Sequence, residues 1–435
     1  MKISPARTAA FDILLRVESE RAYSSVLLPE FEENLSPKDR GLCHELTLGA
    51  LRRQLYLDKI IEQFTTGKRL DLSVAVSLRL GLYQLLFLDK IPAYSAINDS
   101  VNLVQRAKKT SAKGLVNAIL RRATREKIEL NYLDEMDRIS VESSHPRWLI
   151  EKWQRQFGAD EAEQLAKANN KAPGNAFRFT LKAAQSHLAT VVAAIRASSQ
   201  PSAHVEGCFF AESVSSELLA ASAEGVVYFQ DEASQMVGNS VGLSVGESFL
   251  DVCAAPGSKT TQIAANQNSN TLMVAGDIYR PRVEFLRENC GRQGVGFVKI
   301  VQYDAERELP FADRSFDAVL IDAPCSGTGT IRHNPEIRYF LDPADFEQLS
   351  KKQLQIAVNA SKLVKPGGRL IYSTCSMEIE ENEEVIGSFL KASDGFEIAM
   401  PRVPGQFVGD GDFARTFPHR DSMDGFFIAQ LNRTH

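Results

Sequence analysis

The sequence lacks a long apolar segment. None of its uninterrupted apolar runs approaches the roughly 18 residues that a membrane-spanning helix needs. The first ten residues, MKISPARTAA, also lack the apolar stretch of a secretory signal. We therefore expect a cytoplasmic protein without a membrane partner. Apolar residues still make up 44% of the chain, which excludes a disordered protein and supports packed cores.

The chain also has few cysteines and lacks two phosphate-binding motifs. The six cysteines are scattered and show no paired spacing of a metal site, so we expect no metal. Without export a disulfide framework is not expected either, and the thiols should stay reduced. The chain contains neither the G-x-x-x-x-G-K-[ST] motif nor the G-x-G-x-x-G motif, so a nucleoside triphosphate or a dinucleotide is not the best hypothesis.

Excess positive charge is absent from the chain as a whole, whose formal net charge is −5, but not from one segment. Residues 105–127 carry eight basic residues against one acidic residue, Glu126. The basic residues are Arg106, Lys108, Lys109, Lys113, Arg121, Arg122, Arg125 and Lys127. The segment is either a face that contacts nucleic-acid phosphates or a solvated basic helix end, and both interpretations stay open.

A length of 435 residues accommodates two or three domains. Residues 1–130 show the apolar spacing of helices and predict an all-α domain. Residues 131–229 alternate helix-like and strand-like segments, which predicts a small α+β unit ahead of the catalytic core. Residues 230–435 alternate short apolar strands with helices, which predicts an α/β domain with a doubly wound parallel sheet.

The stretch FLDVCAAPGSKTTQIA, residues 249–264, is the centre of this α/β domain. It consists of a short apolar strand, a tight Pro-Gly turn and the start of a helix. Such a turn brings the backbone close to a ligand at the carboxyl end of a strand, beside a helix N-terminus. We therefore expect a ligand at this turn.

Three aspartates end the strands that follow. Asp277 comes after the second strand of the domain, Asp304 after the third and Asp322 after the fourth. Asp277 can accept hydrogen bonds from both hydroxyls of a ribose, and Asp304 can accept one from the amino group of an adenine. One aspartate at a strand end is often only a cap, but three in register are harder to explain that way. The pattern predicts an adenosine without phosphates, and S-adenosylmethionine fits.

Two cysteines follow the fourth and fifth strands. Cys325 lies in DAPCSGTGTIRHNPEIRY, and Cys375 lies in STCSMEIEENEE. A single cysteine is more often a small buried apolar residue than a nucleophile. Because neighbouring parallel strands bring their ends to one rim, two cysteines beside the donor turn favour a catalytic interpretation.

Methyl transfer to carbon 5 of a cytosine explains the thiols. That carbon is a poor nucleophile until a thiolate adds to carbon 6, which divides one difficult step into two easier ones. Asp322 is placed to hold the ring nitrogen and the amino group of the base. A reactive thiol needs an electropositive setting or a helix start, and the helix predicted over 379–391 would supply one to Cys375.

These motifs resemble those of the RNA (cytosine-5)-methyltransferases of the NSUN/Sun/Nop2 group. The segments that carry the resemblance are CAAPGSKT, DAPCSGTGTIRHNPEIRY, STCSMEIEENEEV, DGFFIAQL and QDEASQMV. The N-terminal part, with GLVNAILRR at 114–122, is similar to the NusB-like domain of the bacterial RsmB/Sun-type members. The resemblance covers essentially the whole chain.

The resemblance implies a Rossmann-like class I methyltransferase domain behind an all-α NusB-like RNA-binding domain. It implies methyl transfer from S-adenosylmethionine to carbon 5 of a cytosine in 16S ribosomal RNA, through a covalent cysteine adduct. It further implies a monomer that acts on unassembled RNA or early in assembly. Cys375 would be the nucleophile, Cys325 would assist product release, and Asp322 would act beside them. The residues expected to bind the donor are Cys253, Ala254, Ala255, Pro256, Gly257, Ser258, Lys259, Asp277, Asp304 and Asp322.

The chain departs from the group at two of these motif positions. Ser258 stands where a second glycine is usual, and a negative φ there would let serine fit the turn. His333 stands where arginine is common, which weakens the expectation of an RNA contact at that position.

Two rival functions remain open at this point. The first is an RNA-binding protein whose catalytic half is a relic, although the intact thiols and the three aspartates argue against it. The second is a DNA cytosine methyltransferase, which would carry a target-recognition insertion that the sequence does not show. An assay that compares DNA and RNA substrates separates the second rival from the RNA enzyme.

Overall fold

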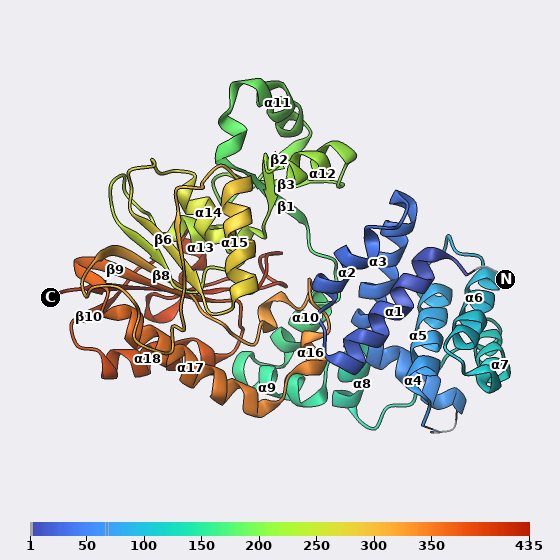
Figure 1. Cartoon of the computed structure of the whole chain (residues 1–435). Helices are drawn as coiled ribbons and strands as arrows, with labels where there is room; N and C mark the ends of the chain where they lie inside the picture. The colour runs from blue at the N-terminus through green and yellow to red at the C-terminus, as the bar shows by residue number, and fades with distance from the viewer. Residues whose placement is uncertain (1–2, 66, 68) are drawn as a thin grey trace. The chain divides into compact units, whose positions relative to one another are not determined.

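The computed structural model describes residues 3–65, 67 and 69–435 of the chain (Figure 1). The chain divides into two compact units. Unit 1 comprises Met1–Ala172 and Ile331–Leu341, and unit 2 comprises Pro173–Thr330 and Asp342–His435. Within the described ranges, no helix has both the length and the apolar character needed to cross a bilayer. The expected sequence boundaries after residues 130 and 229 stay a prediction.

The described part of unit 1 is helical, as the sequence predicts. Its helices are α1 (Pro5–Glu20), α2 (Ser24–Glu32), α3 (Pro37–Arg52), α4 (Gln54–Thr65), α5 (Leu72–Phe87), α6 (Ala93–Arg106), η1 (Thr110–Ala112), α7 (Lys113–Ala123), α8 (Glu135–Ser143), α9 (Arg147–Phe157), α10 (Ala159–Ala168) and α16 (Ile337–Phe340). Helix α5 is apolar around most of its circumference, and such a helix belongs in a core. It begins where Asp71 caps the backbone N–H of Ser73 at 3.0 Å.

Helix α5 also carries a buried cation. Arg79 forms ion pairs with Asp58 and Glu18, and these partners raise the pKa of its guanidinium although burial alone would lower it. The buried arginine is tolerated because two carboxylates bind the N–H groups of its guanidinium.

The basic segment of unit 1 is partly neutralised by the fold. Four of its eight cations form ion pairs: Arg106 with Asp12, Lys109 with Asp71, Arg122 with Glu126, and Lys127 with Glu129. Three of these four carboxylates lie outside residues 105–127, so the sequence count overstates the local excess of positive charge. The ion pairs favour the solvated interpretation for half of the segment and leave the phosphate-contacting one open for the rest.

The short segment Ile331–Leu341 belongs to unit 1, although the motif that contains it begins in unit 2. Arg338 is fully buried there, and its guanidinium donates to the backbone oxygens of Ser143 at 3.2 Å and Ser144 at 3.3 Å. It also donates to Oδ1 of Asn170 at 2.8 Å. Burial lowers the pKa of Arg338 to about 10. The segment is therefore fixed to unit 1 by a buried cation whose partners here are carbonyl oxygens.

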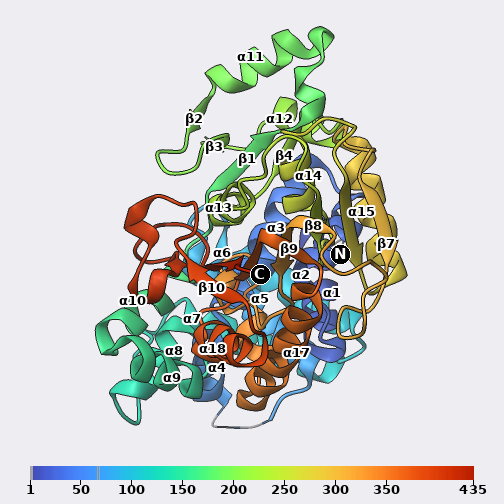
Figure 2. The same cartoon turned by 90° about the vertical axis from the view of Figure 1, so that its left-hand side faces the viewer.

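Unit 2 begins with a small antiparallel sheet. Its elements are β1 (Asn175–Phe179), α11 (Ala189–Ala197), β2 (Ser199–Pro201), β3 (Cys208–Ala211), α12 (Ser216–Ala223) and β4 (Val227–Phe229). The strand order is β2-β3-β1-β4, and Figure 2 shows these strands with α11 and α12 beside them. Phe177 of β1 packs with Ile195 of α11 and Leu218 of α12 in one apolar cluster. The α+β unit predicted from the sequence is confirmed.

The rest of unit 2 is built on one large mixed sheet. Its elements are α13 (Glu232–Ser240), β5 (Phe249–Asp251), α14 (Ser258–Ala264), β6 (Met273–Asp277), α15 (Arg280–Arg292), β7 (Lys299–Gln302), β8 (Phe316–Asp322), α17 (Pro343–Ser361), β9 (Val364–Thr374), α18 (Glu383–Ala392), β10 (Phe396–Ala399), β11 (Ala414–Arg415) and β12 (Phe427–Arg433). The order is β10-β12-β9-β8-β5-β6-β7, with β11 paired to β12. The five strands from β9 to β7 are parallel, whereas β12 runs antiparallel to both of its neighbours, β9 and β10.

Helices cover both faces of this sheet (Figure 1). Side chains alternate along each strand, so Phe249 of β5 joins one apolar cluster and Leu250 joins another. The first cluster includes residues of α13, α14 and α15, and the second includes residues of α17 and α18. The doubly wound architecture predicted from the sequence is confirmed, and the reversed strand β12 and its neighbour β10 extend one edge.

A sequence pattern typical of a helix end lies inside a strand. The sequence Lys365-Pro366-Gly367-Gly368 suggests the end of a helix, but α17 ends at Ser361 and these residues lie inside β9. The register of β8 against β9 shifts at this point, as in a β-bulge. A Cβ on Gly368 would lie 2.7 Å from the carbonyl oxygen of Asp317, so the glycine permits close approach of the two strands.

We predict that Arg338→Ala lowers the free energy of unfolding of the chain by about 3 kcal/mol, because several buried carbonyl oxygens lose their donor. Urea denaturation followed by circular dichroism measures the loss. The matched control is Arg155→Ala, which removes an exposed arginine of α9 in the same unit. Equal midpoints for the two variants would contradict the anchoring role of Arg338.

Candidate active site

The candidate active site lies at the carboxyl ends of β5 and β8, which are adjacent in the sheet. From β5 the chain goes outward through β6 to β7, and then returns to β8 on the other side of β5. The loops after β5 and β8 therefore leave the sheet in opposite directions, which opens the crevice where doubly wound folds bind ligands.

The loop after β5 makes the predicted turn. Gly257 has φ +99°, and a Cβ at this position would lie 2.6 Å from Cδ1 of Leu286 in α15. Both the backbone angle and the close approach favour glycine. Ser258 begins α14 and is not among the described residues with positive φ, so serine fits here as expected.

A cavity of about 380 Å³ lies beside this loop. Its lining includes the predicted residues Cys253, Ala255, Asp277, Asp304, Asp322, Cys325 and Cys375. Five sequence segments that are far apart in the chain thus meet at one cavity, as the strand ends predict. The other five loop residues expected to bind the donor are not part of the cavity lining, as far as the described residues define it. They are Ala254, Pro256, Gly257, Ser258 and Lys259.

Two aspartates of the cavity, Asp277 and Asp304, accept hydrogen bonds from backbone N–H groups. Asp277 is almost fully buried, and its carboxylate accepts from the N–H of Ala255 at 3.2 Å and of Ile278 at 2.9 Å. Asp304 accepts from the N–H of Glu306 at 3.0 Å and keeps about a third of its side chain exposed. Asp277 therefore ties the donor loop to the end of β6, and Asp304 presents a carboxylate to the cavity.

Asp322 lies between a cation and a hydroxyl. Its Oδ2 accepts from Nζ of Lys259 at 2.6 Å, and its Oδ1 accepts from Oγ of Ser373 at 3.0 Å. Burial alone would lower the pKa of Lys259, but Asp322 raises it above its ordinary value, so the ammonium keeps its charge. Lys259 thus bonds Asp322, a residue of the cavity lining, but is not itself part of that lining as the described residues define it.

The two thiols are in contact. The sulphurs of Cys325 and Cys375 lie 3.4 Å apart, and each residue is half-buried. The hydrogen bond with Cys375, together with burial, raises the pKa of Cys325 well above its ordinary value. Cys325 therefore retains its proton, which it can donate to the Cys375 sulphur.

The segment after Cys375 differs from the continuous helix that the sequence predicts. The predicted helix over 379–391 is broken, since a 3₁₀ turn at Ile379–Glu381 is separated from α18 by Asn382, whose ψ is −99°. Asn382 leaves the helical region while its side chain donates to the carbonyl oxygen of Ser376 at 2.9 Å. The cation near Cys375 is Lys259, whose raised pKa is due in part to that sulphur. Lys259 is thus a source of positive charge that the sequence did not indicate, and a contribution from the turn after Cys375 stays a prediction.

A buried arginine next to the donor loop was missed from the sequence. Arg178 of β1 is 4% exposed, and its guanidinium donates to the carbonyl oxygen of Ser258 at 3.0 Å and to Oγ1 of Thr261 at 2.7 Å. Burial lowers its pKa to about 10. Arg178 joins the small sheet to the first turn of α14, and no spacing in the sequence pointed to this contact.

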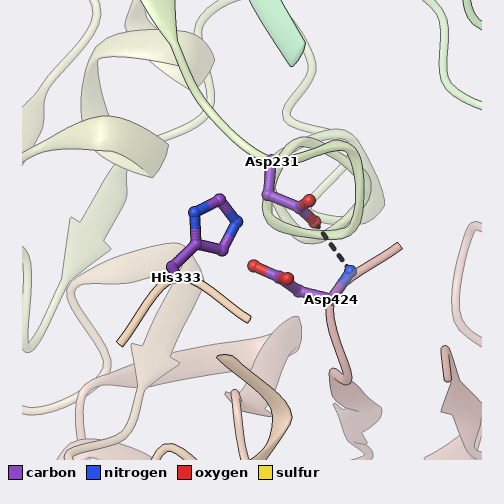
Figure 3. Close-up of side chains that lie close together, drawn as sticks. All are labelled: Asp231, His333 and Asp424. Atoms are coloured by element: carbon purple, nitrogen blue, oxygen red, sulfur yellow. Dashed lines mark hydrogen bonds between the residues drawn. The ribbon is translucent and has the colours of Figure 1, made fainter. Parts of the chain in front are cut away.

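Two further motif segments meet elsewhere in unit 2. Asp231 caps α13 through the N–H of Ala233 at 2.9 Å. The same oxygen accepts from the N–H of Asp424 at 3.2 Å, as Figure 3 shows. The segments QDEASQMV and DGFFIAQL are thereby joined by a backbone hydrogen bond, which gives them a structural role.

The fold and the site define a methyltransferase. The solved protein PH0851 is similar over the whole length of both chains, with a TM-score of 0.84 and 26% identity. A methyltransferase homologue from Pyrococcus horikoshii shares the fold over 69% of this chain and all of its own, with a TM-score of 0.55 and 24% identity.

Sequence comparisons identify the family. The model of 16S rRNA methyltransferase RsmB/F matches residues 241–432, the NusB family model matches residues 4–125, and the ferredoxin-like domain of RsmF/B-like methyltransferases matches residues 145–205. The probable ribosomal RNA small subunit methyltransferase B of Bacillus subtilis (strain 168) is 32% identical over 453 residues, which cover all of both chains. The ribosomal RNA small subunit methyltransferase B of Pseudomonas putida is 34% identical over 98% of both chains. The chain belongs to the family of ribosomal RNA small subunit methyltransferase B.

Asp251, at the end of β5, yields a testable pH dependence. Its carboxyl is fully buried, and burial raises its pKa to about 7, although Oγ1 of Thr260 donates to it at 2.6 Å. The folded state keeps this proton up to about pH 7, whereas the unfolded chain loses it near pH 4. This group therefore makes the fold less stable as the pH rises through that interval.

We predict that Asp251→Asn removes this loss. Between pH 5 and pH 8, the free energy of unfolding of the variant should rise relative to that of the wild type by about 3 kcal/mol. Urea denaturation at both pH values measures the difference. Asp313→Asn, at an exposed position, should keep the wild-type pH dependence. A parallel pH dependence for Asp251→Asn and the wild type would show that Asp251 is ionised in the fold.

Proposed function

We propose that this protein transfers a methyl group from S-adenosylmethionine to carbon 5 of a cytosine in 16S ribosomal RNA through a covalent cysteine adduct. The observation that carries the proposal is the contact of the Cys325 and Cys375 sulphurs, 3.4 Å apart, at the edge of a cavity in a methyltransferase fold. The RNA named for the family supports the choice of substrate. We further propose a monomer that acts in the cytoplasm on unassembled RNA or early in assembly.

The cavity suits an adenosine-containing donor. Its volume falls in the usual range of ligand sites. Ile278, Ala305, Pro324 and Ile356 supply apolar walls for an adenine ring, and the carboxylates of Asp277 and Asp304 are acceptors for ribose hydroxyls and an amino group. Cys253 and Ala255 would lie along the methionine part, with the rest of the loop to Lys259 behind them. When bound, the donor supplies an electrophilic methyl group on a sulfonium.

The chain's own groups would act on the base. Cys375 would add to carbon 6 of the cytosine, which makes carbon 5 nucleophilic. Asp322, held by Lys259 and Ser373, would hold the ring nitrogen and amino group. After methylation the proton on carbon 5 leaves and the Cys375 sulphur is expelled. Cys325, in contact with that sulphur, would assist this release.

Unit 1 would bind the RNA through the cations that its ion pairs leave over. Lys108, Arg121 and Arg125 are exposed, and none of them forms an ion pair with a carboxylate in the described part of the chain. These three residues fit phosphate contacts better than the four paired cations do.

The direct test maps 5-methylcytosine in ribosomal RNA. RNA from a strain that lacks this chain should lose one modified cytosine, and the purified protein with S-adenosylmethionine should restore it. Restored methylation on DNA instead of RNA, or binding of the donor without methyl transfer to any RNA, would overturn the proposal in favour of one of its two rivals.

We predict that Cys375→Ala abolishes both methyl transfer and the covalent protein–RNA adduct, because the nucleophile is lost. Cys325→Ala should instead accumulate the adduct, because release is impaired. Denaturing gels of protein with radiolabelled RNA, together with tritium transfer from the donor, distinguish the two outcomes. Cys43→Ala, a thiol of unit 1, serves as the control with normal turnover. Turnover by Cys375→Ala would exclude it as the nucleophile.

We predict that Asp304→Ala weakens binding of S-adenosylmethionine by about tenfold, because one charge-assisted hydrogen bond is lost. Isothermal titration calorimetry measures the dissociation constant without RNA. Glu308→Ala, an exposed carboxylate outside the cavity lining, should bind the donor as the wild type does. Unchanged affinity in Asp304→Ala would remove this residue from the donor site.

A further inference from the structure

A fully buried carboxylate, that of Glu381, joins the two loops that carry the thiols. Its Oε1 accepts from the backbone N–H of Ser326 at 2.9 Å, and its Oε2 accepts from the hydroxyls of Ser326 and Ser376. Ser326 directly follows Cys325, and Ser376 directly follows Cys375. One side chain thus holds the residue next to each reactive sulphur.

The carboxylate has all its acceptor positions filled. Nε2 of Gln353 in α17 donates to Oε1 at 2.9 Å, which completes four hydrogen bonds to two oxygens. The phenol of Tyr372 in β9 donates to the carbonyl oxygen of Glu381 at 2.6 Å, so the backbone of Glu381 is fixed as well. The carboxylate is therefore held between β9 and α17.

All four donors to this carboxylate are neutral groups. A buried carboxylate costs several kcal/mol of hydration, and neutral donors offset less of that cost than a cation would. A glutamine would fill the same volume without the charge. The charge therefore costs stability, which points to a role at the site beside it.

We propose that Glu381 is a positioning residue for the transfer reaction, because it holds the Cys325 and Cys375 loops together so that their sulphurs stay in contact. Its link to the reaction rests on the proposed function, whereas the positioning of the sulphurs does not. The loops also touch directly, through the N–H of Gly329 and the carbonyl oxygen of Cys375 at 2.9 Å, and through the hydroxyls of Ser326 and Ser376 at 3.1 Å. These contacts bring the loops together, and Glu381 fixes the two residues that adjoin the sulphurs.

The charge of Glu381 also acts on one thiol. The pKa of Cys325 is raised by the hydrogen bond with Cys375, by burial, by the charge of Cys375 and then by that of Glu381. The titratable groups that act on Cys325 are thus Cys375 and Glu381, and Cys325 in turn raises the pKa of Tyr372. The carboxylate helps Cys325 keep its proton, which suits a thiol that acts after the nucleophile.

The first experiment measures the contact of the sulphurs without RNA. Phenylarsine oxide bridges two thiols that lie side by side, with the two thiol protons and the oxide oxygen leaving as water. The wild type should bind it through Cys325 and Cys375 in the presence of excess 2-mercaptoethanol, and Cys325→Ser should not. In Glu381→Gln an amide NH₂ replaces one acceptor oxygen, so the affinity should fall by about tenfold. Glu384→Gln, with the same charge change at an exposed position of α18, should bind as the wild type does.

The second experiment measures turnover on ribosomal RNA from a strain that lacks this chain. Glu381→Gln should lower kcat by about tenfold or more. It should leave the dissociation constant of S-adenosylmethionine unchanged, because Glu381 is not part of the cavity lining. The removal of its charge should also lower the pH at which iodoacetamide alkylates Cys325. A loss of stability alone would lower kcat and weaken donor binding together, whereas the positioning role lowers kcat at an unchanged dissociation constant.

Two results would overturn the proposal. The first is that Glu381→Gln binds the arsenical as tightly as Glu384→Gln does. The second is that the two variants have the same kcat. If Glu381→Gln does not fold, the double variant Ser326→Ala with Ser376→Ala removes two of the four hydrogen bonds and keeps the charge, so arsenical affinity should still fall and the alkylation pH should not. If the wild type transfers no methyl group to any RNA, the proposed function fails, while the arsenical comparison still decides the positioning role.

Discussion

The parallel pairing of β8 with β9 is the constraint on which the site depends. Asp322 pairs with Ser373 in the register of these strands, and the N–H of Ala323 donates to the carbonyl oxygen of Ser373 at 2.8 Å. Three residues beyond Asp322 and two beyond Ser373 lie the thiols. A slip of the register by one residue would turn the side chains to the other face of the sheet and separate the sulphurs. The bulge at Gly368 lies at the far end of the same pair of strands, where it does not disturb this register.

The electrostatics of the site follow from this pairing. Lys259 is paired with Asp322, the Cys375 sulphur helps to raise the pKa of Lys259, and the charge of Glu381 helps to raise the pKa of Cys325. The two thiols therefore have different environments, although both follow strand ends and both precede a serine. That asymmetry supports different roles for Cys375 and Cys325, which the spacing of the cysteines does not distinguish. Family membership shows a methyltransferase, and the different surroundings of the two sulphurs are consistent with the separate roles proposed for them.

Much of the fold was predictable because its signals are local. Apolar spacing identified the helices of unit 1, and short apolar strands identified the order of elements in unit 2. Seven of the predicted site residues line one cavity, since strand ends in a parallel sheet share one edge. Pro366-Gly367-Gly368 is a pattern typical of a helix end, but here it forms a bulge opposite Asp317, which is distant in sequence. The prediction of one continuous helix over 379–391 failed for a similar reason, because the side chain of Asn382 bonds the loop that carries Cys375.

The sequence by itself determined which chemistry is present: an apolar strand before a Gly turn, three aspartates and two cysteines at strand ends, and a helical N-terminal part. These are properties of neighbouring residues and of regular spacing. Only the tertiary structure decided that the sulphurs touch, that Lys259 bonds Asp322, and that Arg178 and Glu381 hold the loops through buried hydrogen bonds. It also decided that residues 331–341 fold with unit 1. Such contacts join residues tens to hundreds of positions apart, and no local propensity records which distant partner a buried polar group will meet.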